Sequence, residues 1–305
     1  MMSSIRELLT WGDMTLRMAL ISTPALDAGL LMSHASDMSK EQLVVSPDQE
    51  VSEEVAACYK GLIHRRCLGE PIAYIIRKKE FFASNFYVDQ RVLIPRPDSE
   101  VMVSVVAEHA TKMPSAHVVD LGCGSGALGL SIKKACPSVT LSLVDDASVF
   151  PVVTKNITEL GVDSFSDIHM YEMSAHAFFA SGVIRQDSQE SLLLVANLPY
   201  VPVDYELPVG VARFEPAHAL FAGVDGLDFY RDVLRQLGEL YSEPITVLAN
   251  CITEQRESVL HHAPIPQTRI VCVIELFSWQ YEILRSEFSH SLFAFFSLSS
   301  ADSIA

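Results

Sequence analysis

The sequence lacks the features of a membrane protein, a secreted protein and a zinc protein. No apolar run reaches the ~18 to 20 residues that a membrane helix needs. Charge interrupts the opening stretch Met1 to Glu7, so we expect no signal-peptide core there. The six cysteines form no CxxC pair and no zinc-type spacing, so we interpret them as reduced, packed thiols. We expect a cytoplasmic protein with no metal site and no membrane contact.

Positive charge is scarce as well. The 305 residues include 22 Lys and Arg against 38 Asp and Glu, which gives a formal net charge of −16. Affinity for nucleic acid rests largely on Lys and Arg that displace counterions, so this charge disfavours wide contact with a phosphate backbone. We predict no direct nucleic-acid contact and favour a protein partner with a basic surface, although many acidic enzymes act on small neutral molecules.

About half of the chain is apolar, which is enough for one large domain or two unequal ones. Residues 1–70 follow a helical pattern, and Gly69 to Pro71 interrupts it. Residues 73–76 and 81–92 are rich in β-branched and aromatic side chains, which predicts a β-hairpin linker over residues 71–97. Asp98 and Ser99 can cap a helix that runs toward His109 at the start of a large domain, residues 98–305.

Predicted strands and helices alternate through the large domain. The strands cover residues 117–121, 140–144, 168–171, 192–196, 245–249 and 269–276, and the helices 127–135, 151–160, 175–180, 227–241 and 253–261. Continuous Leu and Val runs between helices indicate a mostly parallel sheet covered on both faces, a doubly wound α/β fold. Ligands bind such sheets at the carboxyl ends of the strands, so the loops after Leu121, Val144 and Ala196 are the candidate sites.

A glycine-rich loop, residues 120–126, joins the first of these strands to a helix. Its glycines permit a tight turn and the close approach of a ligand. Asp120 would repel a pyrophosphate but can accept a hydrogen bond from the ammonium group of a methionine-type cofactor. Asp145, about twenty residues on, can accept ribose hydroxyls from either a nicotinamide or an S-adenosylmethionine cofactor. We predict S-adenosylmethionine, and the relaxed GxGxxA fingerprint leaves a nicotinamide-dependent oxidoreductase as the alternative.

The segment Asn197, Leu198, Pro199 and Tyr200 follows another strand and reaches the same crevice. An amide nitrogen is a poor nucleophile because its lone pair is delocalised. The Asn197 side-chain oxygen and the Leu198 carbonyl can accept both N–H bonds of an NH₂ group and aim its lone pair at a methyl group. Pro199 favours an extended Leu198, and Tyr200 can pack on the planar group. The alternative is an ordinary Asn-Pro turn.

The candidate site residues fall into two sets. The predicted catalytic residues are Asn197, Leu198, Pro199 and Tyr200. The predicted cofactor-binding residues are Asp120, Gly122, Cys123, Gly124, Ser125, Gly126, Asp145 and Asn197.

Five stretches together resemble the release-factor glutamine methyltransferases, the PrmC/HemK family. They are residues 69–74 (GEPIAY), 91–100 (RVLIPRPDSE), 120–126 (DLGCGSG), 213–216 (RFEP) and 223–231 (GVDGLDFYR). The resemblance implies a class I methyltransferase with a seven-stranded sheet and a helical N-terminal domain for substrate recognition. It also implies S-adenosylmethionine as cofactor and N5-methylation of the glutamine in the Gly-Gly-Gln motif of class I peptide chain release factors, in translation termination.

The sequence departs from the family pattern at four places. Leu198 replaces the first motif proline and keeps the backbone acceptor, whereas Ser174-Ala175 replaces an acid-aromatic pair that contacts adenine. Residues 249–251 replace a late Glu-x-Gly segment, and the sequence after Leu276 is unlike the family. The competing hypotheses are an N6-adenine nucleic-acid methyltransferase, a methyltransferase for a ribosomal-protein glutamine, and a non-catalytic binding module.

Overall fold

The computed structural model describes residues 3–113, 116–162, 167–184, 191–240, 246–252, 255, 269–275 and 282–285. The chain divides into two compact units. The helical unit comprises Met1–Lys78, Val88–Gln90 and Leu207–Glu215, and the sheet unit comprises Lys79–Tyr87, Arg91–Glu206 and Pro216–Ala305. Among the described residues, no helix combines the length and the apolar character that crossing a membrane requires.

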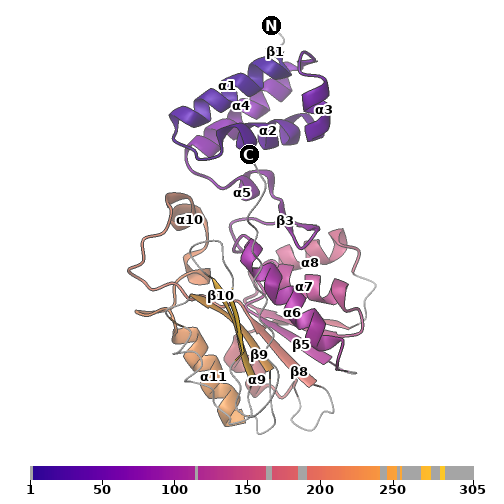
Figure 1. Cartoon of the computed structure of the whole chain (residues 1–305), viewed down its shortest axis with the longest axis vertical. Helices are drawn as coiled ribbons and strands as arrows, with labels where there is room; N and C mark the ends of the chain where they lie inside the picture. The colour runs from indigo at the N-terminus through magenta and orange to yellow at the C-terminus, as the bar shows by residue number, and fades with distance from the viewer. Residues whose placement is uncertain are drawn as a thin grey trace. The chain divides into compact units, whose positions relative to one another are not determined.

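The helical unit is a small bundle (Figure 1). It contains α1 (Ile5–Met18), α2 (Pro24–Ser36), α3 (Lys40–Val45), α4 (Glu53–Cys67), α5 (Ile72–Ile76) and α10 (Val209–Phe214), with β1 (Ser3–Ser4) paired to β2 (Glu50–Val51). Ser4 and Glu7 form a capping box at the start of α1, which satisfies backbone N–H groups that a helix start leaves unpaired. A partly buried Arg66–Asp27 ion pair of 2.7 Å links α4 to α2. Helices α1 to α5 enclose an apolar core that includes Ile5, Leu31 and Tyr59.

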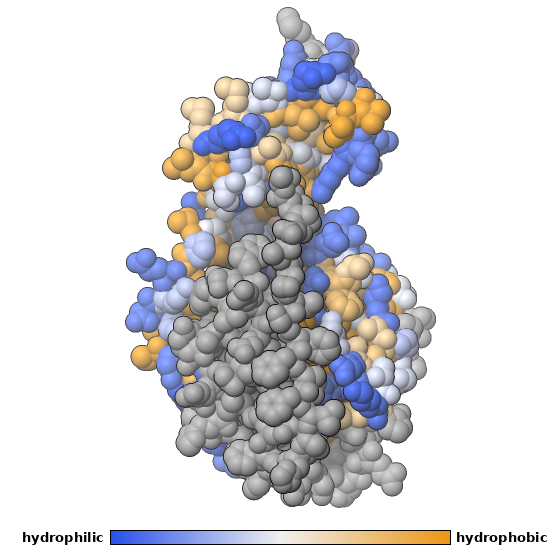
Figure 2. Space-filling view, in the orientation of Figure 1, coloured by the Kyte–Doolittle hydropathy of each residue, from blue (hydrophilic) through white to orange (hydrophobic). Residues whose placement is uncertain are grey.

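Some apolar side chains of the helical unit lie on its surface. Val44 and Val45, at the end of α3, are exposed, and Figure 2 shows apolar colour over this helix among hydrophilic neighbours. Isolated exposed apolar residues are normal on folded proteins.

The prediction of an extended conformation for Ala73–Ile76 is wrong, because these residues belong to helix α5. The Pro71 carbonyl accepts hydrogen bonds from the N–H groups of Tyr74 and Ile75, which closes the first turn. Ala73, Tyr74 and Ile75 are all buried. Packing therefore overrides the strand preference of β-branched and aromatic residues, which depends strongly on context.

The sheet unit is built on a seven-stranded sheet within its described residues. The strands are β5 (Ala116–Leu121), β6 (Thr140–Asp145), β7 (Ile168–Glu172), β8 (Ser191–Ala196), β9 (Thr246–Ile252), β10 (Arg269–Glu275) and β11 (Glu282–Arg285), in the order β11-β10-β9-β8-β5-β6-β7. Only β11 is antiparallel to its neighbour. The chain moves outward from β5 through β6 to β7 and then returns to β8, so the order reverses between β5 and β8. Ligands bind at such a switch point.

Helices cover both faces of this sheet (Figure 1). They are α6 (Glu100–Ala110), α7 (Ala127–Ala135) and α8 (Phe150–Glu159) on one side, and α9 (Ala175–Ala180) and α11 (Asp228–Leu240) on the other. The short hairpin β3 (Lys79–Phe81) and β4 (Ser84–Phe86) and the 3₁₀ turns η1 (Pro97–Ser99) and η2 (Ala217–Ala219) complete the unit. The predicted doubly wound α/β fold is confirmed.

Most predicted elements of the sheet unit are confirmed, and α7 and α9 have the predicted bounds. Ser99 is the N-cap residue of α6, as predicted, but its side chain makes no capping hydrogen bond and instead accepts one from Asn197. The predicted helix 253–261 lies outside the described residues except for Gln255.

Candidate active site

The glycine loop turns sharply between β5 and α7. The N–H groups of Gly122 and Cys123 both donate to the Val144 carbonyl, at 2.9 and 3.3 Å, which ties the turn to the neighbouring strand β6. Gly122, Gly124 and Gly126 have φ values of +68°, +53° and +76°. Side chains other than glycine rarely adopt this left-handed conformation, so the turn explains the glycine spacing.

Asp120 lies under this loop and is only 1% exposed. Its Oδ2 accepts a hydrogen bond of 2.8 Å from the Gly129 N–H in the first turn of α7. Burial raises the pKa of Asp120 to about 7; the Gly129 hydrogen bond opposes this shift and the nearby charge of Asp145 adds to it. A buried carboxyl of this kind gains from a cationic ligand, because the ligand would compensate the charge that burial disfavours.

Asp145, at the end of β6, shapes the same loop. Its Oδ2 accepts from the Gly124 N–H at 2.8 Å and its Oδ1 accepts from the Asp146 N–H at 2.7 Å. Burial raises the pKa of Asp145, and these two hydrogen bonds limit the rise. The predicted ribose acceptor therefore also fixes the backbone of the glycine loop.

Asn156, on the buried side of α8, holds the glycine loop through a side-chain hydrogen bond. It is fully buried, and its Nδ2 donates to the carbonyls of Ser125 at 2.8 Å and Tyr87 at 3.0 Å. Its Oδ1 accepts from the Tyr87 N–H at 2.6 Å. One side chain thus joins the glycine loop to the segment that follows the β3–β4 hairpin.

The Asn197 loop begins where β8 ends. The buried Tyr230 hydroxyl, from α11, donates to the Ala196 carbonyl at 3.0 Å and holds the last residue of the strand. Asn197 Nδ2 donates to Ser99 Oγ at 3.3 Å. Leu198 is buried against the glycine loop, since a Cβ on Gly122 would lie 3.1 Å from Leu198 Cδ2. The two predicted loops therefore pack directly on each other.

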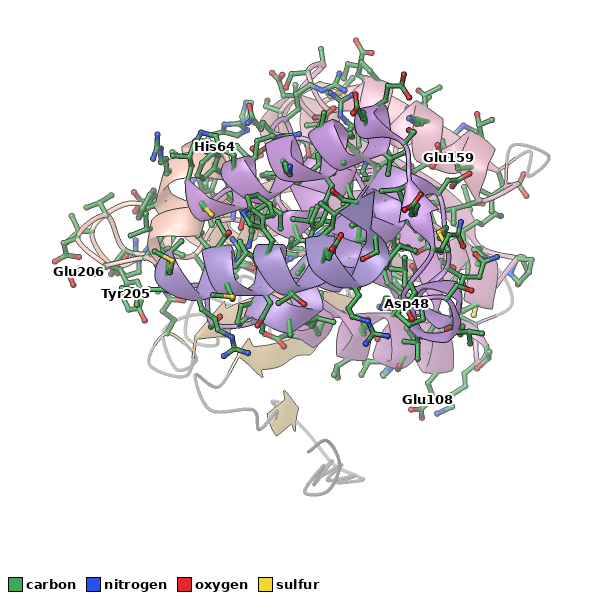
Figure 3. The ribbon with its side chains drawn as sticks, turned by 90° about the horizontal axis from the view of Figure 1, so that it is seen from above. Asp48, His64, Glu108, Glu159, Tyr205 and Glu206 are labelled. Carbon is green, nitrogen blue, oxygen red and sulfur yellow. The ribbon has the colours of Figure 1, made fainter. Side chains whose placement is uncertain are left out.

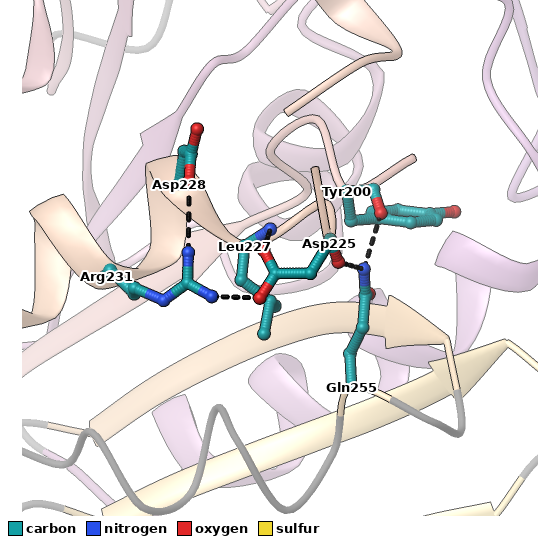
Figure 4. A network of polar contacts seen from close by, with 6 residues as sticks. All are labelled: Tyr200, Asp225, Leu227, Asp228, Arg231 and Gln255. Atoms are coloured by element: carbon teal, nitrogen blue, oxygen red, sulfur yellow. Dashed lines mark hydrogen bonds and ion pairs between the residues drawn. The ribbon is translucent and has the colours of Figure 1, made fainter. Parts of the chain in front are cut away.

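Beyond Pro199 the loop is held by the segment 220–228 (Figure 4). Val201 exchanges backbone hydrogen bonds of 2.9 Å with Leu220 and Ala222. Gln255 Nε2 donates to the carbonyls of Tyr200 and Asp225, each at 2.7 Å. Further along, Tyr205 and Glu206 project outward from the sheet unit (Figure 3).

A cavity of about 500 Å³ opens at these loops, within the range typical of small-molecule sites. The predicted residues that line it are Asp120, Gly122, Cys123, Gly124, Ser125, Asp145, Asn197, Leu198 and Pro199. Gly126 and Tyr200 lie outside the lining; Gly126 is instead the N-cap residue of α7. The structure thus brings together nearly all of the residues predicted from two distant segments.

The charge of the lining is mainly negative. Its carboxylates are Asp120, Asp145, Asp146 and Glu172, and its basic side chains are Arg91 and His218. This set favours a ligand with cationic groups and disfavours a pyrophosphate.

Two family models match the sequence: the PrmC N-terminal domain at residues 7–76 and the methyltransferase small domain at residues 97–181. A release factor glutamine methyltransferase from Aliivibrio fischeri is 33% identical over 225 residues, which cover 73% of this chain and 76% of that relative. This chain belongs to the release factor glutamine methyltransferase family. A second member, from Geobacter sulfurreducens, is 32% identical over 261 residues, which cover 84% of this chain and 87% of that relative.

As a member of this family, the chain is a methyltransferase that uses S-adenosylmethionine. The residues of the cavity fit this cofactor, which carries a sulfonium, an ammonium group and a ribose. Asp120 would meet the ammonium group and Asp145 the ribose hydroxyls. The nicotinamide alternative from the glycine fingerprint is excluded by family membership, in agreement with the acidic lining.

Sequence reasoning missed several residues of this methyltransferase site. Ser99, Phe81, Arg91, His218 and Phe229 line the cavity. Asn156 had a usable signal, because it shares a helix face with the apolar Val152 and Val153, where a polar side chain needs a partner. Ser174 and Ala175, noted as a departure, also line the cavity, and the Ser174 hydroxyl caps α9 by accepting from the Ala177 N–H.

Proposed function

We propose that this methyltransferase modifies the N5 side-chain nitrogen of the glutamine in the Gly-Gly-Gln motif of class I peptide chain release factors. The observation that carries the proposal is that Asn197 and Leu198 line one cavity with Asp120 and Asp145, with Leu198 packed against the glycine loop. The relatives' names support a release factor as the substrate. We expect the chain to act in the cytoplasm, where translation ends.

The roles of the residues follow from the chemistry of an amide. Bound S-adenosylmethionine supplies an electrophilic methyl group on a sulfonium. The Asn197 side-chain oxygen and the Leu198 carbonyl accept the two N–H bonds of the glutamine amide and direct its lone pair to that methyl group. Tyr200 packs on the planar amide. Methylation makes the nitrogen acidic, so water can take the proton that leaves, and the site needs no strong base.

We also propose a separate role for each of three parts of the chain. Residues 1–70 would recognise the protein substrate, residues 71–97 would link the parts, and residues 98–305 would carry out catalysis. The match of the PrmC N-terminal domain to residues 7–76 supports a family-specific role for the first part. The net charge of −16 supports a partner with a basic surface.

The test incubates the protein with S-adenosylmethionine and an unmodified release factor, and peptide mass spectrometry then locates added methyl groups. We expect one methyl group on the Gly-Gly-Gln glutamine. A release factor with that glutamine replaced by glutamate is the control. No added methyl, or a methyl on another residue or on a ribosomal protein or DNA instead, would refute the proposal.

Asn197→Ala provides the site-specific test. We expect it to retain cofactor binding, measured by calorimetry, and to lose most methyl transfer, because it removes an acceptor for the substrate nitrogen. Equal loss of binding and transfer would make Asn197 chiefly a cofactor ligand.

A further inference from the structure

Gln255 is the one described residue of segment 253–261, and it is 5% exposed beside the Asn197 loop. Its carboxamide nitrogen carries two N–H bonds, and the structure uses them on two carbonyls: Tyr200 at 2.7 Å and Asp225 at 2.7 Å. The two carbonyls belong to segments 25 residues apart in the sequence, and Gln255 bridges them (Figure 4).

The surrounding backbone is shaped to admit this bridge. Gly226, with φ of +76°, faces the Tyr200 carbonyl so closely that a Cβ there would overlap both the carbonyl oxygen and Gln255 Nε2. The neighbouring Asp225 is fixed in turn: its carboxylate pairs with Arg231 and accepts from the Leu227 N–H at 3.2 Å. Arg231 also pairs with Asp228 at 3.0 Å. Gln255 therefore joins Tyr200 to a segment that is itself held in place.

We propose that Gln255 is a positioning residue for methyl transfer, which acts by fixing the backbone of Tyr200 and thereby the end of the loop that carries Asn197 and Leu198. This inference rests on the proposed role of the Asn197 loop. A carbonyl acceptor such as that of Leu198 is effective only at a defined place, and a shift of about 1 Å in a positioned group can lower a rate about a hundredfold. The bridge requires two N–H donors on one atom, which the carboxamide of Gln supplies. An apolar side chain has no donor, and an ionised carboxylate can only accept hydrogen bonds.

The experiment compares Gln255→Met and Gln255→Glu with the wild-type protein in release-factor methylation at saturating cofactor, from pH 6 to 8.5. We expect Gln255→Met to lower kcat about a hundredfold at every pH, with the cofactor Kd unchanged within about threefold. Gln255→Glu would place a carboxylate against two carbonyl oxygens, near Asp225, Asp228 and Arg231. Once protonated, its O–H can donate to one carbonyl. Its activity relative to wild type should therefore rise as the pH falls, whereas that of Gln255→Met stays flat.

Hydrogen exchange provides the second measurement and does not need a substrate. Both variants should accelerate exchange of the Val201 amide and of the Val203 amide, which donates to the Gly223 carbonyl at 3.0 Å, while leaving the amides of β5 unchanged. Flat relative activity for Gln255→Glu, or kcat close to wild type for Gln255→Met, would overturn the inference. If the wild-type protein methylates no release factor, the proposed function fails, and unchanged exchange at Val201 and Val203 would then refute the role of Gln255 separately.

Discussion

Replacing Gly226 with alanine should damage both the stability and the activity of this methyltransferase. At a φ of +76°, any residue with a Cβ incurs a left-handed penalty of roughly 1 to 2 kcal/mol. The added Cβ would also lie 2.7 Å from the Tyr200 carbonyl carbon and overlap the Gln255 amide nitrogen. Both Gln255 hydrogen bonds would then be lost, at about 1 kcal/mol each. We expect the free energy of unfolding to fall by about 3 to 4 kcal/mol.

Gly161→Ala is the matched control. Gly161 has a similar φ of +65°, but a Cβ there would meet no atom within 4 Å, so this variant carries the backbone penalty alone. Urea unfolding followed by circular dichroism should show Gly226→Ala less stable than Gly161→Ala by about 2 kcal/mol. Single-turnover methylation should fall about a hundredfold for Gly226→Ala only. Equal losses in the two variants would refute the proposed steric and hydrogen-bonding role of Gly226.

Three further outcomes follow from the site. Tyr230→Phe removes the donor to the Ala196 carbonyl and should cost about 1 to 3 kcal/mol in urea unfolding, with a larger fall in kcat than in cofactor affinity. Burial raises the pKa of Asp120 to about 7, and the ionised carboxylate is the form that should bind the cofactor's ammonium group. Cofactor affinity measured by calorimetry should therefore rise up to about tenfold per pH unit between pH 5.5 and 7 and level off above pH 7. Asp120→Asn should abolish this pH dependence. Asn156→Leu removes three hydrogen bonds and should lower the free energy of unfolding by about 3 kcal/mol and weaken cofactor binding. Full retention of both stability and binding would contradict the role of Asn156 in holding the glycine loop.

Asp120 also makes the stability of the protein without cofactor depend on pH. The carboxyl of Asp120 binds its proton more tightly in the folded state, where its pKa is about 7, than in an unfolded chain, where it is near 3.9. Its protonated form therefore favours folding at low pH, and that contribution is lost as the pH rises through 7. As the pH rises from about 4 to 7, urea unfolding should therefore show the free energy of unfolding of the wild-type protein falling relative to that of Asp120→Asn.

The sequence by itself determined the alternating strands and helices, the glycine turn and the place of Asn197 at a strand end. These features depend on local periodicity and on glycine's access to positive φ, and both are visible in neighbouring residues. Parallel strands bring their carboxyl ends to one edge, so the meeting of residues 120–126 with residues 197–199 was also predictable.

Only the tertiary structure decided which atoms hold those loops. Ser99 meets Asn197 across 98 residues of sequence, and Asn156 meets Tyr87 across 69. The local pattern predicted a capping role for Ser99 and an extended conformation for Ala73–Ile76. Ser99 occupies the N-cap position, but packing gives its side chain a different partner, and packing makes Ala73–Ile76 helical. A hydroxyl or carboxamide can satisfy many partners, and its actual partner depends on how distant segments pack, which sequence periodicity does not encode.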